Sequence, residues 1–268
     1  MQVKAKKSLG QNFLQDEGVI AEILRIAEVE PGEAVLEIGP GTGALTEALC
    51  AREAELIAIE LDHELVLRLQ KHFVDSKNVS ILEGNILDMH LASLIDESSF
   101  SEKGYKIIAN IPYYITAPII RTLLSLPVQP KSLTLMVQDE VAKRLAAPPG
   151  SMSLLSVMAQ YYADVEKRLF VPKEAFLPVP KVESAVIHIC PKRSYDKEAD
   201  RKFFRLVRAG FSARRKTLAN NLSSSLQVPR TEVEELFEIL GLRKDIRAQA
   251  LSIADWEKLE ALWQERFS

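Results

Sequence analysis

Short apolar segments alternate with helix-like segments from residue 19 to residue 137, and this alternation limits the possible folds more than any other feature. Apolar spacings of three and four residues predict helices over 19–27, 44–51, 63–73 and 116–125, with Asp16 available to cap the first. Continuous apolar runs predict strands over 34–38, 56–59, 79–82, 106–109 and 132–137. Such alternation forms βαβ units, so we expect an α/β fold with a mostly parallel, doubly wound sheet.

The pattern changes towards the end of the chain. A proline-punctuated loop over 172–180 leads to an apolar strand over 185–189, and from Pro191 onward only helix-like segments follow. We therefore expect two domains, which a chain of 268 residues can accommodate. The first is an α/β domain over 1–190 that begins with a loop over 1–15, and the second is a small all-helical domain over 191–268.

Composition excludes several classes of protein. Shares of 47% hydrophobic and 26% charged residues are those of a globular chain. Cys50 and Cys190 lie far apart and the four histidines are scattered, so we expect neither a disulfide nor a metal site. The most apolar stretch, 115–128, contains Arg121 and two prolines and is not expected to span a membrane. No apolar segment follows the basic N-terminus as in a signal peptide, so a cytoplasmic location is expected.

A glycine-rich turn, Gly39-Pro-Gly-Thr-Gly-Ala44, follows the first strand of the alternating region and precedes a helix. Glycines in such a turn let the backbone approach a ligand closely. Glu60, about twenty residues further on, is placed to hold ribose hydroxyls. Gly39, Gly41 and Glu60 are therefore candidate cofactor contacts, but the pattern alone fits a dinucleotide as well as S-adenosylmethionine. A tight turn that binds no ligand is the other interpretation.

Asn110-Ile-Pro-Tyr113 stands at the end of a later predicted strand and indicates a specific chemistry. The exocyclic amine of adenine is a poor nucleophile because its lone pair is delocalised into the ring. The side-chain oxygen of Asn110 and a backbone carbonyl oxygen of Ile111 or Pro112 can each accept one N–H and draw the nitrogen towards tetrahedral geometry. Pro112 stiffens the loop, and Tyr113 offers a ring on which the base can stack. The segment resembles the signature of methyltransferases that act on nucleobase amino groups. The alternative is a plain turn followed by core aromatics.

A cationic segment lies late in the chain. Seven lysines and arginines and no acid occur between Arg201 and Lys216. The net charge of −3 hides this, because residues from 191 onward carry +4 and the rest carries −7. A solvated helix face is one interpretation, but beside a nucleobase site we predict contacts with RNA phosphates. The predicted RNA-binding residues are Arg201, Arg205, Arg208, Arg214, Arg215 and Lys216.

The chain resembles, nearly from end to end, the small-subunit (16S) ribosomal RNA adenine N6,N6-dimethyltransferase family. The segments that carry the resemblance are Lys7–Leu14, Glu37–Gly43, Ile59–Asp62, Asn110–Tyr113, Leu155–Tyr162, Ala175–Val182 and Phe211–Thr217. It implies a Rossmann-like methyltransferase fold with a helical C-terminal domain, and S-adenosyl-L-methionine as cofactor. It also implies dimethylation of two adjacent adenosines near the 3′ end of 16S rRNA in an immature small ribosomal subunit.

The same resemblance implies roles for single residues. Asn12, Leu14, Gly39, Glu60 and Asn110 match the family's contacts with the methyl donor. The residue after Gly84 is usually Asp in this family; here Asn85 can still accept a hydrogen bond from the donor's adenine, but without charge assistance. We therefore expect weaker donor binding. Phe176 matches an aromatic residue that packs on the target base opposite Tyr113, which makes Asn110, Pro112, Tyr113 and Phe176 the predicted catalytic group.

Three other functions fit parts of the sequence. The related 23S rRNA adenine methyltransferases share the active-site motif, and a ribosome assembly factor without catalysis would keep the RNA-binding features. The glycine turn and Glu60 alone also allow an NAD-dependent oxidoreductase. The long matches over 175–182 and 211–217 favour the small-subunit enzyme, for which we expect a monomer.

Overall fold

The computed structural model describes residues 5–6 and 9–267, apart from the side chain of Tyr114. The rest of the predicted N-terminal loop, including Lys4 and Lys7, lies outside the described residues. Contacts divide the chain into two units. The first unit comprises Met1–Lys143 and Ala163–Ser194, and the second comprises Arg144–Tyr162 and Tyr195–Ser268.

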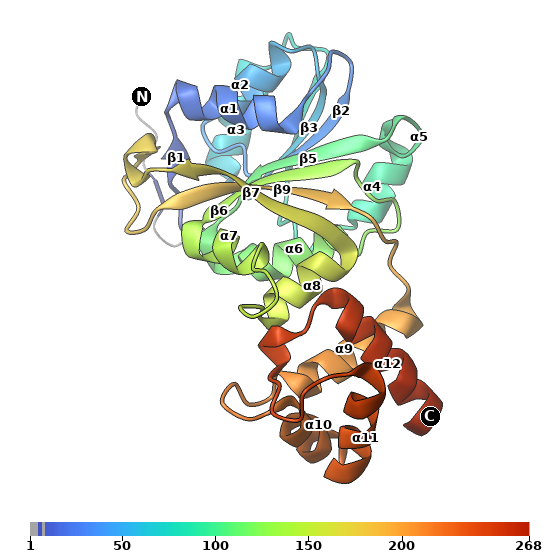
Figure 1. Cartoon of the computed structure of the whole chain (residues 1–268). Helices are drawn as coiled ribbons and strands as arrows, with labels where there is room; N and C mark the ends of the chain where they lie inside the picture. The colour runs from blue at the N-terminus through green and yellow to red at the C-terminus, as the bar shows by residue number, and fades with distance from the viewer. Residues whose placement is uncertain (1–4, 7–8, 268) are drawn as a thin grey trace. The chain divides into compact units, whose positions relative to one another are not determined.

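The first unit is built on a seven-stranded sheet with the order β4-β3-β2-β5-β6-β9-β7 (Figure 1). Five neighbouring strands are parallel: β2 (Ala34–Ile38), β3 (Glu55–Glu60), β4 (Val79–Glu83), β5 (Tyr105–Asn110) and β6 (Ser132–Gln138). The strand β9 (Ser184–Pro191) is antiparallel to both of its neighbours, β6 and the edge strand β7 (Ala163–Val171). The predicted α/β fold with a mostly parallel sheet is confirmed.

Helices cover both faces of the sheet (Figure 1). The helices on one face are α1 (Glu17–Ala27), α2 (Ala44–Cys50) and α3 (His63–His72). The remaining helices that follow the parallel strands are α4 (Leu91–Glu97), α5 (Phe100–Lys103), α6 (Thr116–Leu124) and α7 (Asp139–Leu145). Asp16 caps α1 as predicted, because its Oδ1 accepts the N–H of Val19 at 3.0 Å. Apolar side chains of α1 and α2 pack on the central strands, and this core holds the strand ends in place.

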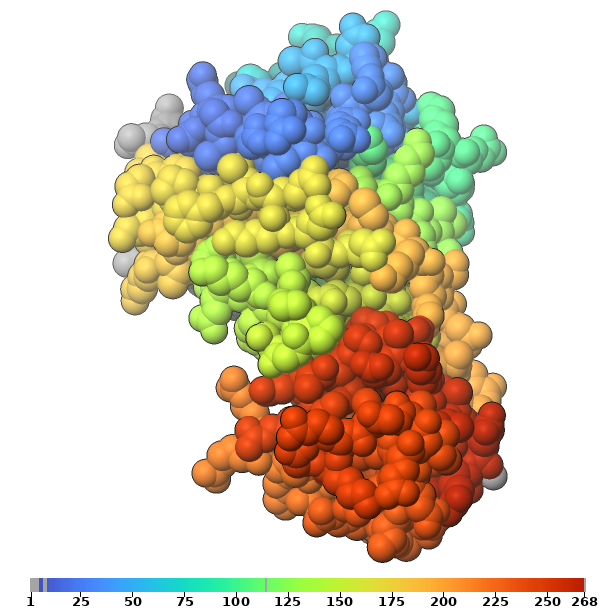
Figure 2. Space-filling view, viewed as in Figure 1, coloured from blue at the N-terminus to red at the C-terminus, as the bar shows by residue number. Residues whose placement is uncertain are grey.

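Part of the first unit differs from the prediction. The charged residues at 166–168 belong to a strand, β7, which the sequence pattern did not predict. Side chains along β7 alternate between exposed and partly buried. The yellow part of the chain, to which β7 belongs, lies at the surface in Figure 2. The proline-punctuated loop contains a short 3₁₀ turn, η3 (Lys173–Ala175), and the strand β8 (Phe176–Leu177). The last residues of the N-terminal loop form β1 (Phe13–Leu14), which pairs antiparallel with β8. The N-terminal segment is therefore fixed to the first unit at Leu14.

The second unit is all-helical. It contains α8 (Leu154–Tyr162), α9 (Lys197–Gly210), α10 (Leu218–Leu226), α11 (Arg230–Leu240) and α12 (Ile253–Phe267). The division differs from the predicted boundary after residue 190, because 144–162 belong to this unit and the later break falls at 194. The reason is aromatic packing: Tyr161 stacks on Phe203 with ring centroids 4.1 Å apart, and the Tyr162 hydroxyl donates to Asp200 at 2.6 Å.

No helix among the described residues combines the length and the apolar character needed to cross a bilayer. In the same part of the chain, no three side chains of His, Cys, Asp or Glu gather as the ligands of a metal ion would.

Candidate active site

The carboxyl ends of three parallel strands meet at one edge of the sheet. Ile38 of β2 pairs in register with Ile59 of β3 on one side and with Ala109 of β5 on the other, so Glu60 and Asn110 follow at this edge on either side of Gly39. The chain continues from β2 to β3 on one side, and β5 lies on the other. Ligands of open α/β sheets bind at such a point, where the strand order reverses.

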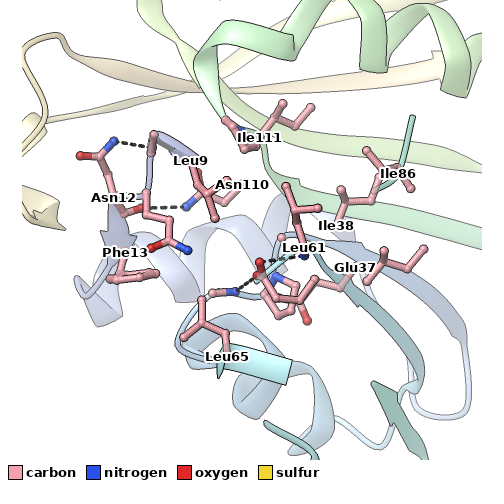
Figure 3. A pocket seen from close by; sticks show the side chains of 18 of the residues that line it. Leu9, Asn12, Phe13, Glu37, Ile38, Leu61, Leu65, Ile86, Asn110 and Ile111 are labelled. Carbon is pink, nitrogen blue, oxygen red and sulfur yellow. Dashed lines mark hydrogen bonds between the residues drawn. The ribbon is translucent and has the colours of Figure 1, made fainter. Parts of the chain in front are cut away.

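A pocket opens at this edge (Figure 3). The N-terminal segment over 9–14, the glycine turn, and the residues that follow β3, β4 and β5 all line it. Nine predicted site residues are among the lining residues: Asn12, Leu14, Gly39, Gly41, Glu60, Asn85, Asn110, Pro112 and Tyr113. Side chains that sequence analysis did not single out complete the wall, among them Phe13, Ile38, Leu61, Leu65 and Ile86.

The glycine turn lies so close to other segments that side chains would not fit. Gly39 has φ +72°, and a Cβ there would lie 3.2 Å from the carbonyl oxygen of Asn110. Gly41 has φ +61°, and its Cβ would lie 3.0 Å from the ring of Phe13. Both positions therefore need glycine for the left-handed backbone and for the close approach.

Two buried carboxyl groups lie beneath the turn. The Oε2 of Glu60 accepts the N–H of Gly41 at 3.0 Å, and its Oε1 accepts the N–H groups of Leu61 and Asp62, both at 2.9 Å. Burial nevertheless raises the pKa of Glu60 above its ordinary value. Glu37 is 1% exposed and accepts the hydroxyl proton of Thr46 at 2.8 Å. Burial raises the pKa of Glu37 to about 8, so this group is largely protonated at neutral pH.

Asn110 is held in one orientation by the N-terminal segment. Its Nδ2 donates to the carbonyl oxygen of Asn12 at 3.4 Å (Figure 3). Among the described residues, no donor occupies its Oδ1, which stays available to an incoming N–H. The carbonyl oxygen of Pro112 accepts the N–H of Ile115 at 3.2 Å, whereas that of Ile111 has no donor in the same part of the chain. Of the acceptors that the sequence suggested, Asn110 Oδ1 and the carbonyl oxygen of Ile111 are therefore the two without a donor among the described residues.

Tyr113 is fixed by a hydrogen bond from the neighbouring strand. Its hydroxyl lies 2.5 Å from the Oγ of Ser184, the first residue of β9. Burial raises the pKa of Tyr113, so its hydroxyl stays protonated at neutral pH and can form this bond. The ring therefore has a defined position at the pocket.

Asn85 has local partners. Its Oδ1 accepts the N–H of Leu87 at 3.1 Å, and its Nδ2 donates to the carboxylate of Asp88 at 2.7 Å. A carbonyl oxygen has a second lone pair, so Asn85 can accept one further hydrogen bond from a ligand. The bond to Asp88 determines which atom of the Asn85 amide faces this carboxylate, because only the nitrogen can donate to it.

The structure does not bring every predicted residue to the pocket. Phe176 is 2% exposed and packs in the core of the first unit, where its strand β8 pairs with Leu14. In this arrangement its ring is not available to a base. The predicted RNA-binding residues belong to the second unit and are all exposed. No described acidic side chain pairs with any of these six cations: Arg201, Arg205, Arg208, Arg214, Arg215 and Lys216.

The pocket fits the methyl donor that the sequence implies. A bound ribose needs a group that accepts hydrogen bonds from its hydroxyls, and Glu60 offers one. It also needs a backbone turn that can approach the ligand closely, which the glycines offer. The aliphatic walls from Ile38, Leu61 and Ile86 suit the faces of an adenine. The acceptors of Asn110 and Ile111 line the same pocket, as a group that binds a target amine beside the donor must. Fold and site together define a Rossmann-like methyltransferase acting on a nucleobase amine.

Comparison with known proteins narrows this class. The model of the ribosomal RNA adenine dimethylase family matches residues 2–265, and the chain belongs to this family. Among curated relatives it is similar to the ribosomal RNA small subunit methyltransferase A of Dehalococcoides mccartyi strain CBDB1, with 38% identity over 96% of this chain and 88% of the relative. The protein of the same name from Ligilactobacillus salivarius is 41% identical over 95% of this chain and 88% of the relative.

Solved structures agree with the fold of both units. A dimethyladenosine transferase from Plasmodium falciparum superimposes with a TM-score of 0.81 and 27% identity, covering 94% of this chain and 98% of that one. The 23S rRNA methyltransferase ErmE superimposes with a TM-score of 0.73 and 26% identity, covering 93% and 98%. The Rossmann-like methyltransferase fold is thereby confirmed.

Proposed function

We propose that this protein transfers methyl groups from S-adenosyl-L-methionine to N6 of two adjacent adenosines near the 3′ end of 16S rRNA. Family membership supports the reaction, and the curated relatives cited above, named as small-subunit methyltransferases, support the substrate. When bound, S-adenosylmethionine supplies an activated methyl group on a sulfonium. The protein's own residues therefore need to bind, orient and exclude water rather than supply a general base.

The observation that carries the proposal is the orientation of Asn110. Because its Nδ2 is engaged by Asn12, its Oδ1 is left to accept one N–H of the adenine amine, and the carbonyl of Ile111 accepts the other. Two acceptors draw the nitrogen lone pair out of conjugation with the ring. Tyr113, held by Ser184, supplies a face for the extruded base to stack on. Glu60 and the glycine turn hold the donor.

The setting of the reaction forms a second part of the proposal. We infer that the substrate is an immature small ribosomal subunit in the cytoplasm and that the enzyme acts as a monomer. The six exposed cations of the second unit, which have no acidic partner among the described residues, support binding to the RNA of such a subunit, because they offer phosphate contacts that do not depend on the pocket. The partly exposed N-terminal cation Lys6 does not add to them, since it pairs with Asp62 at 2.6 Å.

The experiment that tests the proposed substrate offers labelled S-adenosylmethionine and three RNAs. The RNAs are unmethylated small subunits, naked 16S rRNA and large subunits. We expect label in the small subunits and little in the other two. Label confined to large subunits would favour a 23S rRNA methyltransferase such as ErmE. Binding of the RNAs without any label in them would favour an assembly factor that lacks catalysis.

A further inference from the structure

Asp62 joins the N-terminal segment to the rim of the pocket. Its side chain is 4% exposed, and both of its oxygens are occupied. The Nζ of Lys6 donates to Oδ1 at 2.6 Å, and the Nε2 of Gln11 donates to Oδ2 at 2.8 Å. A further bond, from the backbone N–H of Lys6 to the Oε1 of Gln11 at 2.7 Å, ties these two partners together. Although burial raises it, the bonds from Lys6 and Gln11 lower the pKa of Asp62 below its ordinary value.

The residues that Asp62 holds form one wall of the pocket. Leu9 to Leu14 line it, and the β1–β8 pair fixes only the end of this stretch at Phe13 and Leu14. Gln11 is the point at which Asp62 fixes the other end. Between these two anchors lies Asn12, whose carbonyl oxygen accepts the Nδ2 of Asn110. The position of this wall therefore depends on Asp62.

Asp62 also contacts the residue predicted to hold the donor's ribose. Its backbone N–H donates to the Oε1 of Glu60 at 2.9 Å. The same residue thus fixes Glu60 through its main chain and the N-terminal wall through its side chain, on two sides of one pocket. No other acidic residue among those described contacts both.

We propose that Asp62 is a positioning residue for the methyl donor, which it serves by clamping Lys6 and Gln11 so that residues 9–14 are pre-arranged as a wall of the pocket. This inference rests on the proposed function, because it takes S-adenosylmethionine as the ligand. Pre-arranging the wall lowers the ordering cost of donor binding, so loss of the clamp weakens binding without changing the groups that touch the reacting atoms.

A purely structural role for Asp62 makes a different prediction. Its Oδ1 also accepts the N–H of Glu64 at 3.1 Å and so caps α3, and loss of a cap lowers stability. Lys6 gives no hydrogen bond to the backbone of α3, although its Nζ also lies 3.4 Å from the Oε2 of Glu64 in the first turn of that helix. A substitution of Lys6 therefore separates the clamp from the cap.

The test is a double-mutant cycle read by calorimetric titration with S-adenosylmethionine. We expect Lys6→Met to raise the donor dissociation constant about two- to fivefold, as expected for a partly exposed ion pair. Asp62→Asn should raise it about three- to tenfold, since a buried charged acceptor is lost. The double variant should have about the same donor dissociation constant as the single variant that binds the donor less tightly, because both substitutions remove the same clamp. Lys6→Arg should bind within about twofold of the wild type.

Lys131→Met is the matched control. Lys131 is a similarly exposed lysine that pairs with the largely buried Glu33 at 3.3 Å, at the opposite edge of the sheet. Its loss should leave the donor dissociation constant unchanged. In steady-state assays, Lys6→Met should raise the donor KM while kcat stays within about twofold, a separation that partial unfolding does not produce.

The outcomes separate the two proposals. If the wild-type protein binds no S-adenosylmethionine, the proposed function fails. If the wild type binds the donor and Lys6→Met binds it equally tightly, the positioning role is overturned while the proposed function stands. An Asp62→Asn variant that melts at lower temperature but keeps the wild-type dissociation constant would assign Asp62 to the helix cap alone and overturn the positioning role as well.

Discussion

The side-chain nitrogen of Asn110 donates to the main-chain oxygen of Asn12 across 98 residues of sequence, and this bond determines which atom of Asn110 remains for a substrate. We expect Asn110→Ala to lower kcat by at least about a hundredfold, because an acceptor for the amine is lost. RNA affinity should stay within about twofold. Single-turnover methyl transfer and fluorescence binding measure the two effects, and near-normal turnover would remove Asn110 from the active site.

Tyr113 and Ser184 allow the ring and the hydroxyl to be tested separately. Tyr113→Ala should cost about 1–3 kcal/mol of transition-state stabilisation, as expected for a lost stacking surface. Tyr113→Phe and Ser184→Ala each remove the same 2.5 Å hydrogen bond and should cost less, by similar amounts. Combined, these two changes should cost little more than either. Equal losses in Tyr113→Ala and Tyr113→Phe would show that the hydroxyl, and not the ring, contributes to the rate.

The buried carboxyl of Glu37 predicts a pH dependence of stability. Its pKa is raised from 4.5 to about 8 in the folded protein by burial, so between these values the folded state binds more protons than the unfolded state. The free energy of unfolding therefore falls with rising pH, by about 1.4 kcal/mol per pH unit for this one group. Glu37→Gln removes the titrating group and keeps an acceptor for Thr46.

This contribution is measured by denaturant unfolding of the wild type and of Glu37→Gln from pH 5 to pH 8, in the absence of S-adenosylmethionine. The stability of Glu37→Gln relative to the wild type should rise steadily over that range. Because other groups titrate in both proteins, the difference isolates Glu37. A difference that stays constant with pH would contradict a raised pKa at this position.

Replacing Asn85 by aspartate is expected to raise the affinity for the methyl donor, by an amount that depends on the neighbouring Asp88. Asn85→Asp would place a carboxylate against that of Asp88, which now accepts from the Asn85 amide at 2.7 Å. The single change should therefore improve donor affinity only slightly. With Asp88→Asn added, the charged acceptor should tighten donor binding about three- to tenfold. Calorimetry with S-adenosylmethionine checks this, and equal affinity of the double variant and the wild type would refute it.

Charge on α9 predicts the salt dependence of RNA binding. Arg205 is exposed and unpaired among the described residues, whereas Lys202 on the same helix pairs with Glu198 at 3.2 Å. Arg205→Ala should reduce the slope of log affinity against log salt by about 1, since one phosphate contact is lost. Lys202→Ala is the matched control and should change the slope less. Equal slopes for Arg205→Ala and the wild type would place the RNA elsewhere.

Sequence periodicity was sufficient for the parallel part of the sheet, because strands buried on both faces are continuous apolar runs. The strand over 34–38 is observed with the predicted bounds as β2, and the other four differ by one or two residues. The edge strand β7 has one partner only, and its sequence does not predict a strand because three charged residues, 166–168, lie in the middle of it. Such charges protect an edge against further pairing, but they interrupt the apolar pattern.

Most of the pocket could be predicted from local motifs. The glycine turn and the Asn110–Tyr113 segment each follow the end of a predicted strand and contain, within a few residues, the groups that a ligand would contact. The contacts of Asp62 could not be found in this way. They join residues 51 and 56 positions apart, and no periodicity or spacing encodes such a distance. Phe176 shows the converse: the sequence contains its motif, but the burial of its ring depends on packing in the core of the first unit, which no local motif encodes.

The most direct test of the proposed activity is mass spectrometry of 16S rRNA after incubation of unmethylated small subunits with S-adenosylmethionine and either the wild type or Asn110→Ala. We predict dimethyladenosine at two adjacent positions near the 3′ end with the wild type, and unmodified adenosine there with the variant. Unmodified adenosines after incubation with the wild type would contradict the proposed activity, and dimethylation by both proteins would contradict the role of Asn110 in it.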